Sequence, residues 1–155
     1  MPVTHARPAV TLAAANRILT AVIAEAEAQG LVVSAAVVDP AGALVAFSRM
    51  DGSPVTVANF AQDKAYTAAT NGRTTRAFAE RMTSKPHLAA GLSTRERLLA
   101  WPGGLPILHE GAVVGGLGVS GASDEEDEAL GAAGLAALTR TPARTPAQTP
   151  SRTPA

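Results

Sequence analysis

The sequence predicts an α/β domain of the α+β type, in which helices flank a central antiparallel sheet. Strand-like stretches come in two pairs, a short turn joins the members of each pair, and helical stretches stand before, between and after the pairs. Strands joined by a tight turn run antiparallel, whereas a parallel sheet needs single strands that alternate with helices. The length of 155 residues and the 46% share of hydrophobic residues suit one domain with its own core.

Two long helices are expected in the first half of the chain. Over 12–29, apolar residues recur at helical spacing, while Thr11 can cap the first amides and Gly30 can end the helix. The second helix is expected over 54–70, with Ser53 as its N-cap and a proline as its first residue. Its many alanines leave little bulk, so its backbone can lie close to the sheet.

Two hairpins supply the expected strands. The run over 31–39 is rich in β-branched residues and nearly continuous in apolarity, which suits a central strand covered on both faces. A tight Pro-Ala-Gly turn leads to the second strand, over 43–49. The second hairpin joins 105–109 to 112–120 across a Glu-Gly turn.

The segment between the second helix and the second hairpin is expected to contain short elements. A short helix is expected over 74–82 and a loop over 83–92. Ser93 and Glu96 have the spacing of a capping box, which predicts a helical turn or two over 94–100.

The end of the chain divides into a closing helix and a tail. The helix is expected over 124–138, because Ser123 and Glu126 have capping-box spacing and acids in the first turn suit the helix dipole. The last residues read TRTPARTPAQTPSRTPA, and proline this frequent blocks both helix and sheet. We therefore predict a folded domain over 1–138 and a disordered Thr/Pro-rich tail over 139–155.

Charge and composition exclude several classes of function. The 13 basic residues balance the 13 acidic ones, so no long-range attraction recruits nucleic acid or an anionic membrane. The absence of cysteine excludes disulfides, thiolate metal sites and cysteine nucleophiles. The chain begins without the apolar stretch of a signal peptide and has no apolar run near the roughly 20 residues of a membrane span, which predicts a cytoplasmic protein.

A glycine-rich stretch after the last strand matches a nucleotide-binding pattern. Residues 116–121 fit GxGxxG between a strand and a helix. The acidic ribose ligand expected about 20 residues later would fall at the start of the Thr-Pro tail. We therefore interpret the glycines as positions where a helix or a ligand approaches the strand closely. Ser120 is no nucleophile-elbow serine, because Ala122 replaces the glycine that the elbow needs.

The acidic run over 124–128 offers a weak metal-site candidate. Only residues three or four apart share a helix face, so Glu125 and Glu128 can bind a cation together. The alternative interpretation is a solvated helix N-terminus that uses its acids for capping.

Polar residues around the second helix and the loops after it are the other candidates. His87, in the expected loop, is the candidate ligand or acid/base, and the alternative is a surface histidine. Asp63 is the candidate base on the second helix. The candidate ligand-binding residues are Met50, Lys64, Tyr66, Arg73, Arg95, Gly103 and Gly104.

Four stretches, which cover most of residues 33–138, resemble a known family in their residues, order and spacing. They are AVVDPAGALVAFSRMDGS (36–53), DKAYTAATNGR (63–73), GGLPI (103–107) and GAVVGGLGVSGASDEEDEALGAAGLAAL (111–138). Together they resemble the GlcG/HbpS family of haem-degrading or PduO C-terminal-like domains. The resemblance implies a profilin-like sandwich with a central antiparallel sheet and a homo-oligomer. It also implies haem or iron binding in some relatives, so it supports the fold more firmly than a function.

The sequence departs from the haem-binding relatives at the iron ligand. Histidine ligands in some relatives lie early in the domain, whereas the first helix here has Asn16 and Arg17 and no histidine. The remaining candidate iron ligands are His87, Met50, Met82 and the hydroxyl of Thr83.

Three functions agree with these features. The first is binding of haem or another small molecule between the second helix and the loops of 83–104, where basic side chains pair with ligand carboxylates. The second is a cofactor-independent isomerase or lyase, with His87 or Asp63 as base and the amides of Gly103 and Gly104 stabilising an oxyanion. The third is a non-catalytic oligomeric scaffold.

Overall fold

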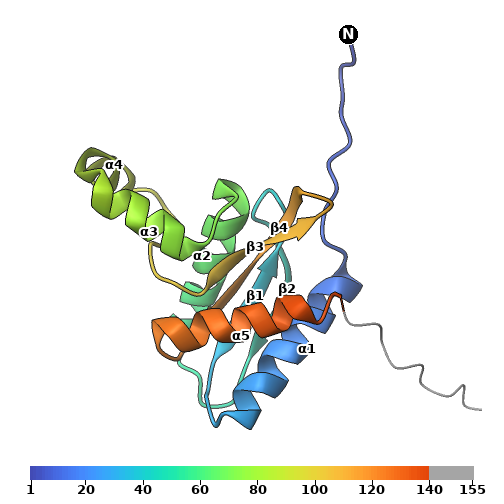
Figure 1. Cartoon of the computed structure of the whole chain (residues 1–155), viewed down its shortest axis with the longest axis vertical. Helices are drawn as coiled ribbons and strands as arrows, with labels where there is room; N and C mark the ends of the chain where they lie inside the picture. Colours follow the sequence, from blue (N-terminus) through green and yellow to red (C-terminus); the bar gives the residue numbers. More distant parts are fainter. Residues whose placement is uncertain (140–155) are drawn as a thin grey trace, which may run out of the picture.

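The helices and the antiparallel sheet appear in the computed structural model, which describes residues 1–139 (Figure 1). The elements are α1 (Leu12–Ala28), β1 (Ser34–Val38), β2 (Leu44–Arg49), α2 (Val55–Asn71), α3 (Thr75–Ser84), α4 (Pro86–Leu92), β3 (Gly104–His109), β4 (Ala112–Ser120) and α5 (Asp124–Ala136). The observed architecture confirms the predicted fold class. The predicted tail lies, apart from Thr139, outside the described residues.

The four strands form one antiparallel sheet in the order β2-β1-β4-β3. Each hairpin contributes two neighbouring strands, and the pairing of β1 with β4 joins the two hairpins. All five residues of β1 are buried, as its nearly continuous apolar run predicts. β2 and β3 are the edge strands.

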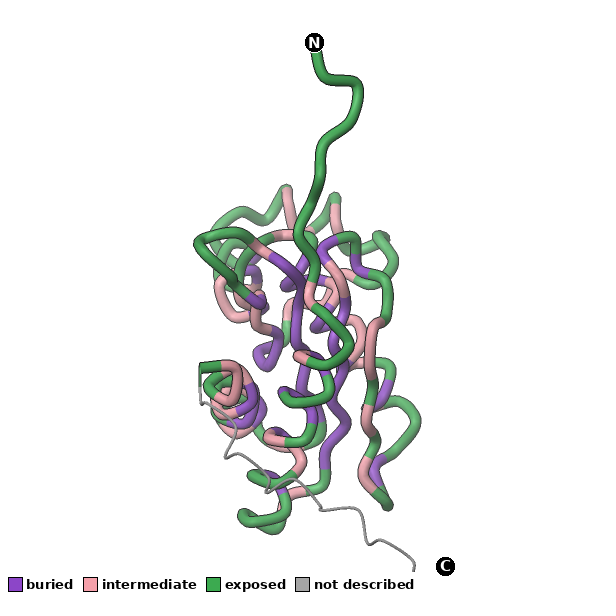
Figure 2. The backbone as a smooth tube through the Cα atoms, turned by 90° about the vertical axis from the view of Figure 1, so that its right-hand side faces the viewer, coloured by how far each residue is buried: buried purple, intermediate pink, exposed green. Residues whose placement is uncertain are grey.

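Helices cover both faces of the sheet, which gives a three-layer arrangement (Figure 1). α1 and α5 pack together on one face, over the main core that contains Ile18, Val22, Leu117 and Leu130. α2 covers the other face through a smaller cluster of alanines and one valine. Buried residues follow the central strands between these layers (Figure 2). No helix within residues 1–139 is long and apolar enough to cross a membrane.

Glycines in β4 allow α2 to lie directly against the sheet. A Cβ added at Gly118 would meet the carbonyl oxygen of Ala61, and one added at Gly116 would meet that of Ala65. Neither position has room for a side chain. Both glycines belong to the GxGxxG stretch, so its interpretation as a close-approach motif is confirmed.

The segment before β3 differs from the expectation in two respects. The expected loop contains α4, which begins with Pro86 at its first helical position. The expected helical turns over 94–100 are wrong, because this backbone forms turns and bends and Arg97 has a φ of 65°. Ser93 ends α4 instead of capping a new helix, and its hydroxyl donates to the carbonyl of Ala90 at 2.9 Å.

α2 begins one residue later than expected. Its N-cap is Pro54, and the neighbouring Ser53 is buried. The Ser53 hydroxyl forms a hydrogen bond of 2.8 Å with the hydroxyl of Ser34 in β1. Ser53 therefore connects the start of α2 to the sheet instead of capping the helix.

Candidate functional site

Asp63 and Tyr66 lie on α2 and meet Arg97, a residue of the turns after α4. The guanidinium carbon of Arg97 lies 4.2 Å from the centroid of the Tyr66 ring. The Nε atom of Arg97 is 3.5 Å from Oδ1 of Asp63, and Nη1 donates to the carbonyl of Gly42 at 3.2 Å. Arg97 therefore connects α2 with the turn between β1 and β2.

A polar pocket of about 430 Å³ opens beside these side chains, and we call it the Arg97 pocket. Its lining residues are Gly42, Ala43, Leu44, Asn59, Gln62, Asp63 and Arg97. The side chains of Asp63 and Arg97 are 32% and 40% exposed. Both charged groups are therefore accessible to a small molecule in the pocket.

The backbone of Arg97 is held in a conformation that favours glycine. Its φ of 65° is in the left-handed region, which costs energy for a residue with a side chain. The Thr67 hydroxyl donates to the Arg97 carbonyl at 3.0 Å and accepts from the Leu99 amide at 2.9 Å. These two bonds fix the position of Arg97 relative to α2.

The prediction that Lys64 binds a ligand carboxylate is corrected by its burial. Lys64 is only 2% exposed, and its ammonium group donates to Asp127 Oδ2 at 2.7 Å and to the carbonyl of Val119 at 2.9 Å. The other oxygen of Asp127 accepts from the amide of Ala122 at 3.1 Å. Burial raises the pKa of the Asp127 carboxyl above its usual value, and the nearby Lys64 opposes this shift. Lys64 thus joins α2 to the start of α5.

Gly103 and Gly104 are buried, which argues against the predicted oxyanion site. The amide of Gly104 donates to the Thr75 hydroxyl at 2.9 Å, and the carbonyl of Gly103 accepts from the Val119 amide at 2.9 Å. The Gly104 amide, which would have to donate to the oxyanion, already donates to Thr75. A Cβ at Gly104 would lie 2.5 Å from the Lys64 carbonyl oxygen, so this glycine serves close packing against α2.

Glu125 and Glu128 form ion pairs with a residue of α3. The guanidinium of Arg76 lies 2.8 Å from Glu128 and 3.6 Å from Glu125. The hydrogen bond with Glu128 raises the pKa of Arg76. Within residues 1–139, no group of three or more acidic or histidine side chains is arranged to hold a metal ion.

His87, Arg73 and Arg95 are exposed. His87 lies on α4, which projects from the three layers together with α3 (Figure 1). Arg73 follows α2 and donates from Nε to the carbonyl of Asn71 at 3.4 Å. None of these three side chains lines the Arg97 pocket.

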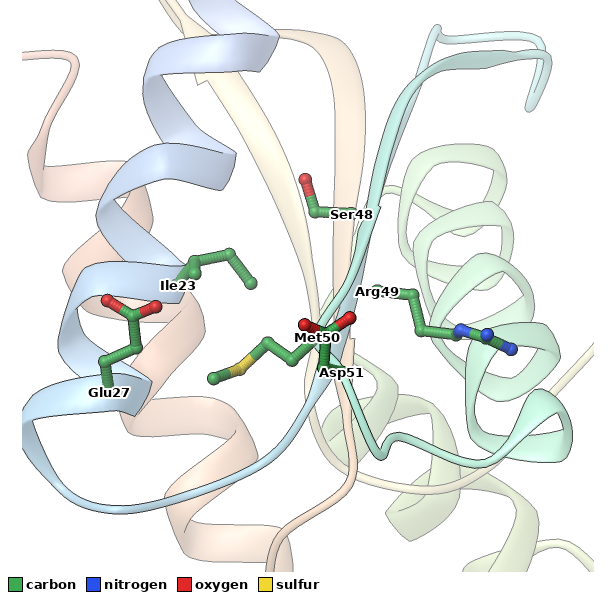
Figure 3. A pocket seen from close by; sticks show the side chains of 6 residues that line it. All are labelled: Ile23, Glu27, Ser48, Arg49, Met50 and Asp51. Carbon is green, nitrogen blue, oxygen red and sulfur yellow. The ribbon is translucent and has the colours of Figure 1, made fainter.

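Met50 lies on the opposite side of the sheet, in a groove between α1 and β2. Figure 3 shows its side chain pointing toward Ile23 and Glu27 of α1, while Arg49 points the other way, toward α2. The thioether sulfur accepts from the Val33 amide at 3.4 Å and packs against the main core. The structure therefore separates Met50 from the candidates on α2.

A second hollow, of about 500 Å³, lies between α3 and the residues before β3, and we call it the Trp101 hollow. Its lining residues are Arg76, Ala79, Glu80, Thr83, Ser84, Ala100, Trp101, Pro102 and Asp124. Trp101 is 49% exposed. Its ring packs edge-on against Phe60 of α2, with 5.0 Å between centroids and 76° between planes. This contact holds a large aromatic surface in place beside the hollow.

Comparison with known protein families matches nearly all of the described fold. The model of the family described as haem-degrading protein, HbpS-like, matches residues 10–136, which include every helix and strand described above. Protein GlcG of Escherichia coli K12 is 37% identical over 106 residues, which cover 68% of this chain and 77% of that protein. An uncharacterized 15.0 kDa protein of Citrobacter freundii, from the dhaT-dhaS intergenic region, is 34% identical over 122 residues, or 78% of this chain and 86% of that one.

Solved structures share the arrangement of helices and strands. The Klebsiella pneumoniae protein ORFY superposes with a TM-score of 0.85 at 27% identity, covering 91% of this chain and 98% of its own. A double mutant of Streptomyces reticuli HbpS gives 0.80 at 34% identity, covering 89% and 97%. A PduOC:haem complex gives 0.75 at 24% identity, covering 83% and 94%, a similarity that shows the fold alone.

Proposed function

The chain belongs to the family of HbpS-like haem-degrading proteins, and from that premise we propose that it binds haem in the Trp101 hollow. The observation that carries the proposal is the half-exposed Trp101 ring, which Phe60 holds beside a hollow of about 500 Å³. A hollow of this size suits a drug-sized or cofactor-sized ligand. That a PduOC domain of the same fold has been crystallised as a haem complex gives further support.

The lining of the Trp101 hollow combines apolar surface for a flat ligand with one basic side chain, Arg76, and two acidic ones, Glu80 and Asp124. Ala79, Ala100, Pro102 and the Trp101 ring offer apolar surface without bulky obstruction. Arg76 lines the same hollow and is 40% exposed on its side chain, so its guanidinium can pair with a propionate. This pairing competes with the present contact between Arg76 and Glu128.

The Thr83 hydroxyl is the candidate iron ligand that lines the hollow. It donates to the Ala79 carbonyl at 3.0 Å, so the oxygen keeps lone pairs for a metal. No histidine, methionine or tyrosine lines this hollow among the described residues, although these are usual haem ligands. Bound haem would supply an iron centre that exchanges electrons. An oxygen ligand from the protein would hold that iron more weakly than an imidazole.

Titration of the purified protein with haemin, followed by the Soret band, tests the proposal. We expect a saturable, shifted band at stoichiometric haemin. Trp101→Ala should weaken binding by about tenfold or more, because an aromatic contact and its buried area are lost. Leu108→Ala is the matched control, since Leu108 is another exposed apolar side chain, at 60%, and lies outside the hollow.

The same titration identifies the iron ligand. With Thr83 as the ligand, Thr83→Val changes the Soret position, whereas His87→Ala leaves it unchanged. A shifted Soret band in His87→Ala alone would identify His87 of α4 as the iron ligand instead. A wild-type spectrum equal to that of free haemin plus protein would overturn the proposal. Haem-degrading activity stays a prediction, which progressive loss of the Soret band on addition of a reductant in air-saturated buffer, but not in its absence or without oxygen, would test.

A further inference from the structure

We propose that the Arg97 pocket is a second binding site, which takes a small, neutral, polyhydroxylated molecule such as a sugar or a polyol. The inference starts from groups in the pocket whose hydrogen-bonding capacity is largely unused. The Asp63 carboxylate contacts Arg97 only at 3.5 Å and accepts no closer hydrogen bond from residues 1–139. A partly exposed carboxylate with such capacity can accept from a ligand.

The other polar side chains of the pocket are also largely free. Gln62 uses its amide nitrogen in a long bond of 3.3 Å to the Ala58 carbonyl, which leaves its amide oxygen without a partner in the described chain. The Asn59 side chain is exposed and has no hydrogen bond within residues 1–139. Arg97 uses Nη1 on Gly42 and the face of its guanidinium on Tyr66. Its remaining N–H groups can donate into the pocket.

The two opposite charges in the pocket cancel, so the site has no net charge that would attract an ion. The negative Asp63 and the positive Arg97 balance each other, and the other two polar side chains are neutral amides. A carboxylate only accepts hydrogen bonds, a guanidinium only donates them, and an amide does both. A hydroxyl group can donate to Asp63 and accept from Arg97 at once. Several neighbouring hydroxyls therefore fit this set of groups better than a single charge does.

The pocket is also built to keep its geometry. Arg97 holds a left-handed backbone conformation, fixed by the Thr67 hydroxyl, and strained residues of this kind are concentrated at functional sites. The stacking on Tyr66 fixes the plane of the guanidinium as well. Binding to such a prepared site loses less conformational freedom than binding to mobile side chains.

Heteronuclear NMR titration of the whole chain with glucose and with mannitol tests the site. We expect saturable shifts in the amides of Gly42–Leu44, Asn59–Asp63 and Arg97. Sodium acetate, at equal concentration, should leave these amides unshifted. No shift in these amides with either glucose or mannitol would overturn the proposal, as would stronger binding of acetate.

Arg97→Gly removes the guanidinium without straining the fold. Glycine adopts a φ of 65° readily, and both hydrogen bonds to Thr67 involve backbone atoms that stay in place. Loss of charge-assisted hydrogen bonds should weaken glucose binding by about ten- to a hundredfold. Glu110→Gly is the matched control, because Glu110 also has a positive φ, of 48°, and lies in the other hairpin's turn.

Asp63→Asn gives an independent test, because it keeps the size of the side chain and removes the carboxylate. It should weaken glucose binding as Arg97→Gly does. Binding that stays at the wild-type level in both variants would overturn the assignment. Haemin binding should be unchanged in both variants, so failure of this site is distinguishable from failure of the Trp101 hollow.

Discussion

Lys64 lies on the face of α2 that packs against the sheet, and its ammonium group meets the carboxylate of Asp127 at 2.7 Å. Both residues are 2% exposed. A buried ion pair is a weak source of stability, but removal of one partner leaves a buried charge without compensation. The folded state therefore depends on both side chains, although the ion pair itself contributes little to the free energy of unfolding.

Lys64→Met should lower the free energy of unfolding by about 3–5 kcal/mol at neutral pH, because Asp127 then has no cation. Urea or guanidinium unfolding measures the change. Arg76→Met is the matched control: the side chain of Arg76 is 40% exposed in its pair with Glu128, so the expected loss is about 1 kcal/mol or less. Equal losses of unfolding free energy in both variants would contradict the conclusion that burial makes the loss of Lys64 costly.

The pH dependence of Lys64→Met has a definite sign. Burial raises the pKa of Asp127, so this group favours folding most below the usual carboxyl pKa, and the contribution is lost as pH rises through the raised value. Without Lys64 the pKa of Asp127 should rise further, because the opposing charge is gone. The destabilisation by Lys64→Met should therefore be smaller near pH 4 than at pH 7. A larger effect in acid would refute this account.

At the scale of elements, the close packing of α2 against the sheet depends on glycines in β4. Gly118→Ala places a methyl group against the Ala61 carbonyl oxygen and 2.5 Å from the Ala65 amide nitrogen. Overpacking of this kind costs about 1–3 kcal/mol, which thermal or chemical unfolding can measure. Gly91→Ala in α4 is the control, since its added Cβ meets nothing within 4 Å. That variant should be neutral or slightly stabilising.

Periodicity and turn residues were sufficient to predict most elements of the fold. The strands over 31–39 and 112–120 were expected near their observed places, because apolar runs and turns are local features. α4 was missed, since a seven-residue helix gives too short a pattern for its period to be recognised. The capping-box spacing of Ser93 and Glu96 was misleading, because Ser93 ends one helix rather than starting another.

The candidate sites were less accessible from the sequence because they depend on distant contacts. Lys64 and Asp127 are 63 residues apart, and no local pattern indicates that they pair. Arg97 was missed for the same reason: it contacts Gly42, 55 residues away, and its left-handed backbone leaves no mark in the sequence. Asp63 and Tyr66 were named as candidates, but their partner was not.

At the scale of the whole molecule, the edge strand β2 carries uncovered apolar side chains. Leu44 and Phe47 pair with Val38 and Ala36, which belong to the core beneath α2. Residues directly opposite in an antiparallel pair lie on the same face, so both side chains lie on the α2 side of the sheet. They are 51% and 36% exposed there. Exposed apolar surface at a sheet edge is typical of a protein–protein contact.

The homo-oligomer that the family resemblance implies should use this surface. We expect light scattering of the purified chain to give a mass above that of one 15.6 kDa chain. Leu44→Lys combined with Phe47→Lys should shift the population toward the monomer, because charges placed on an apolar contact must be desolvated. Leu108→Lys, at the other edge strand, is the matched control and should keep the oligomer. A monomeric wild type would refute the oligomer. An oligomer unaffected by the double substitution would place the contact elsewhere on the molecule.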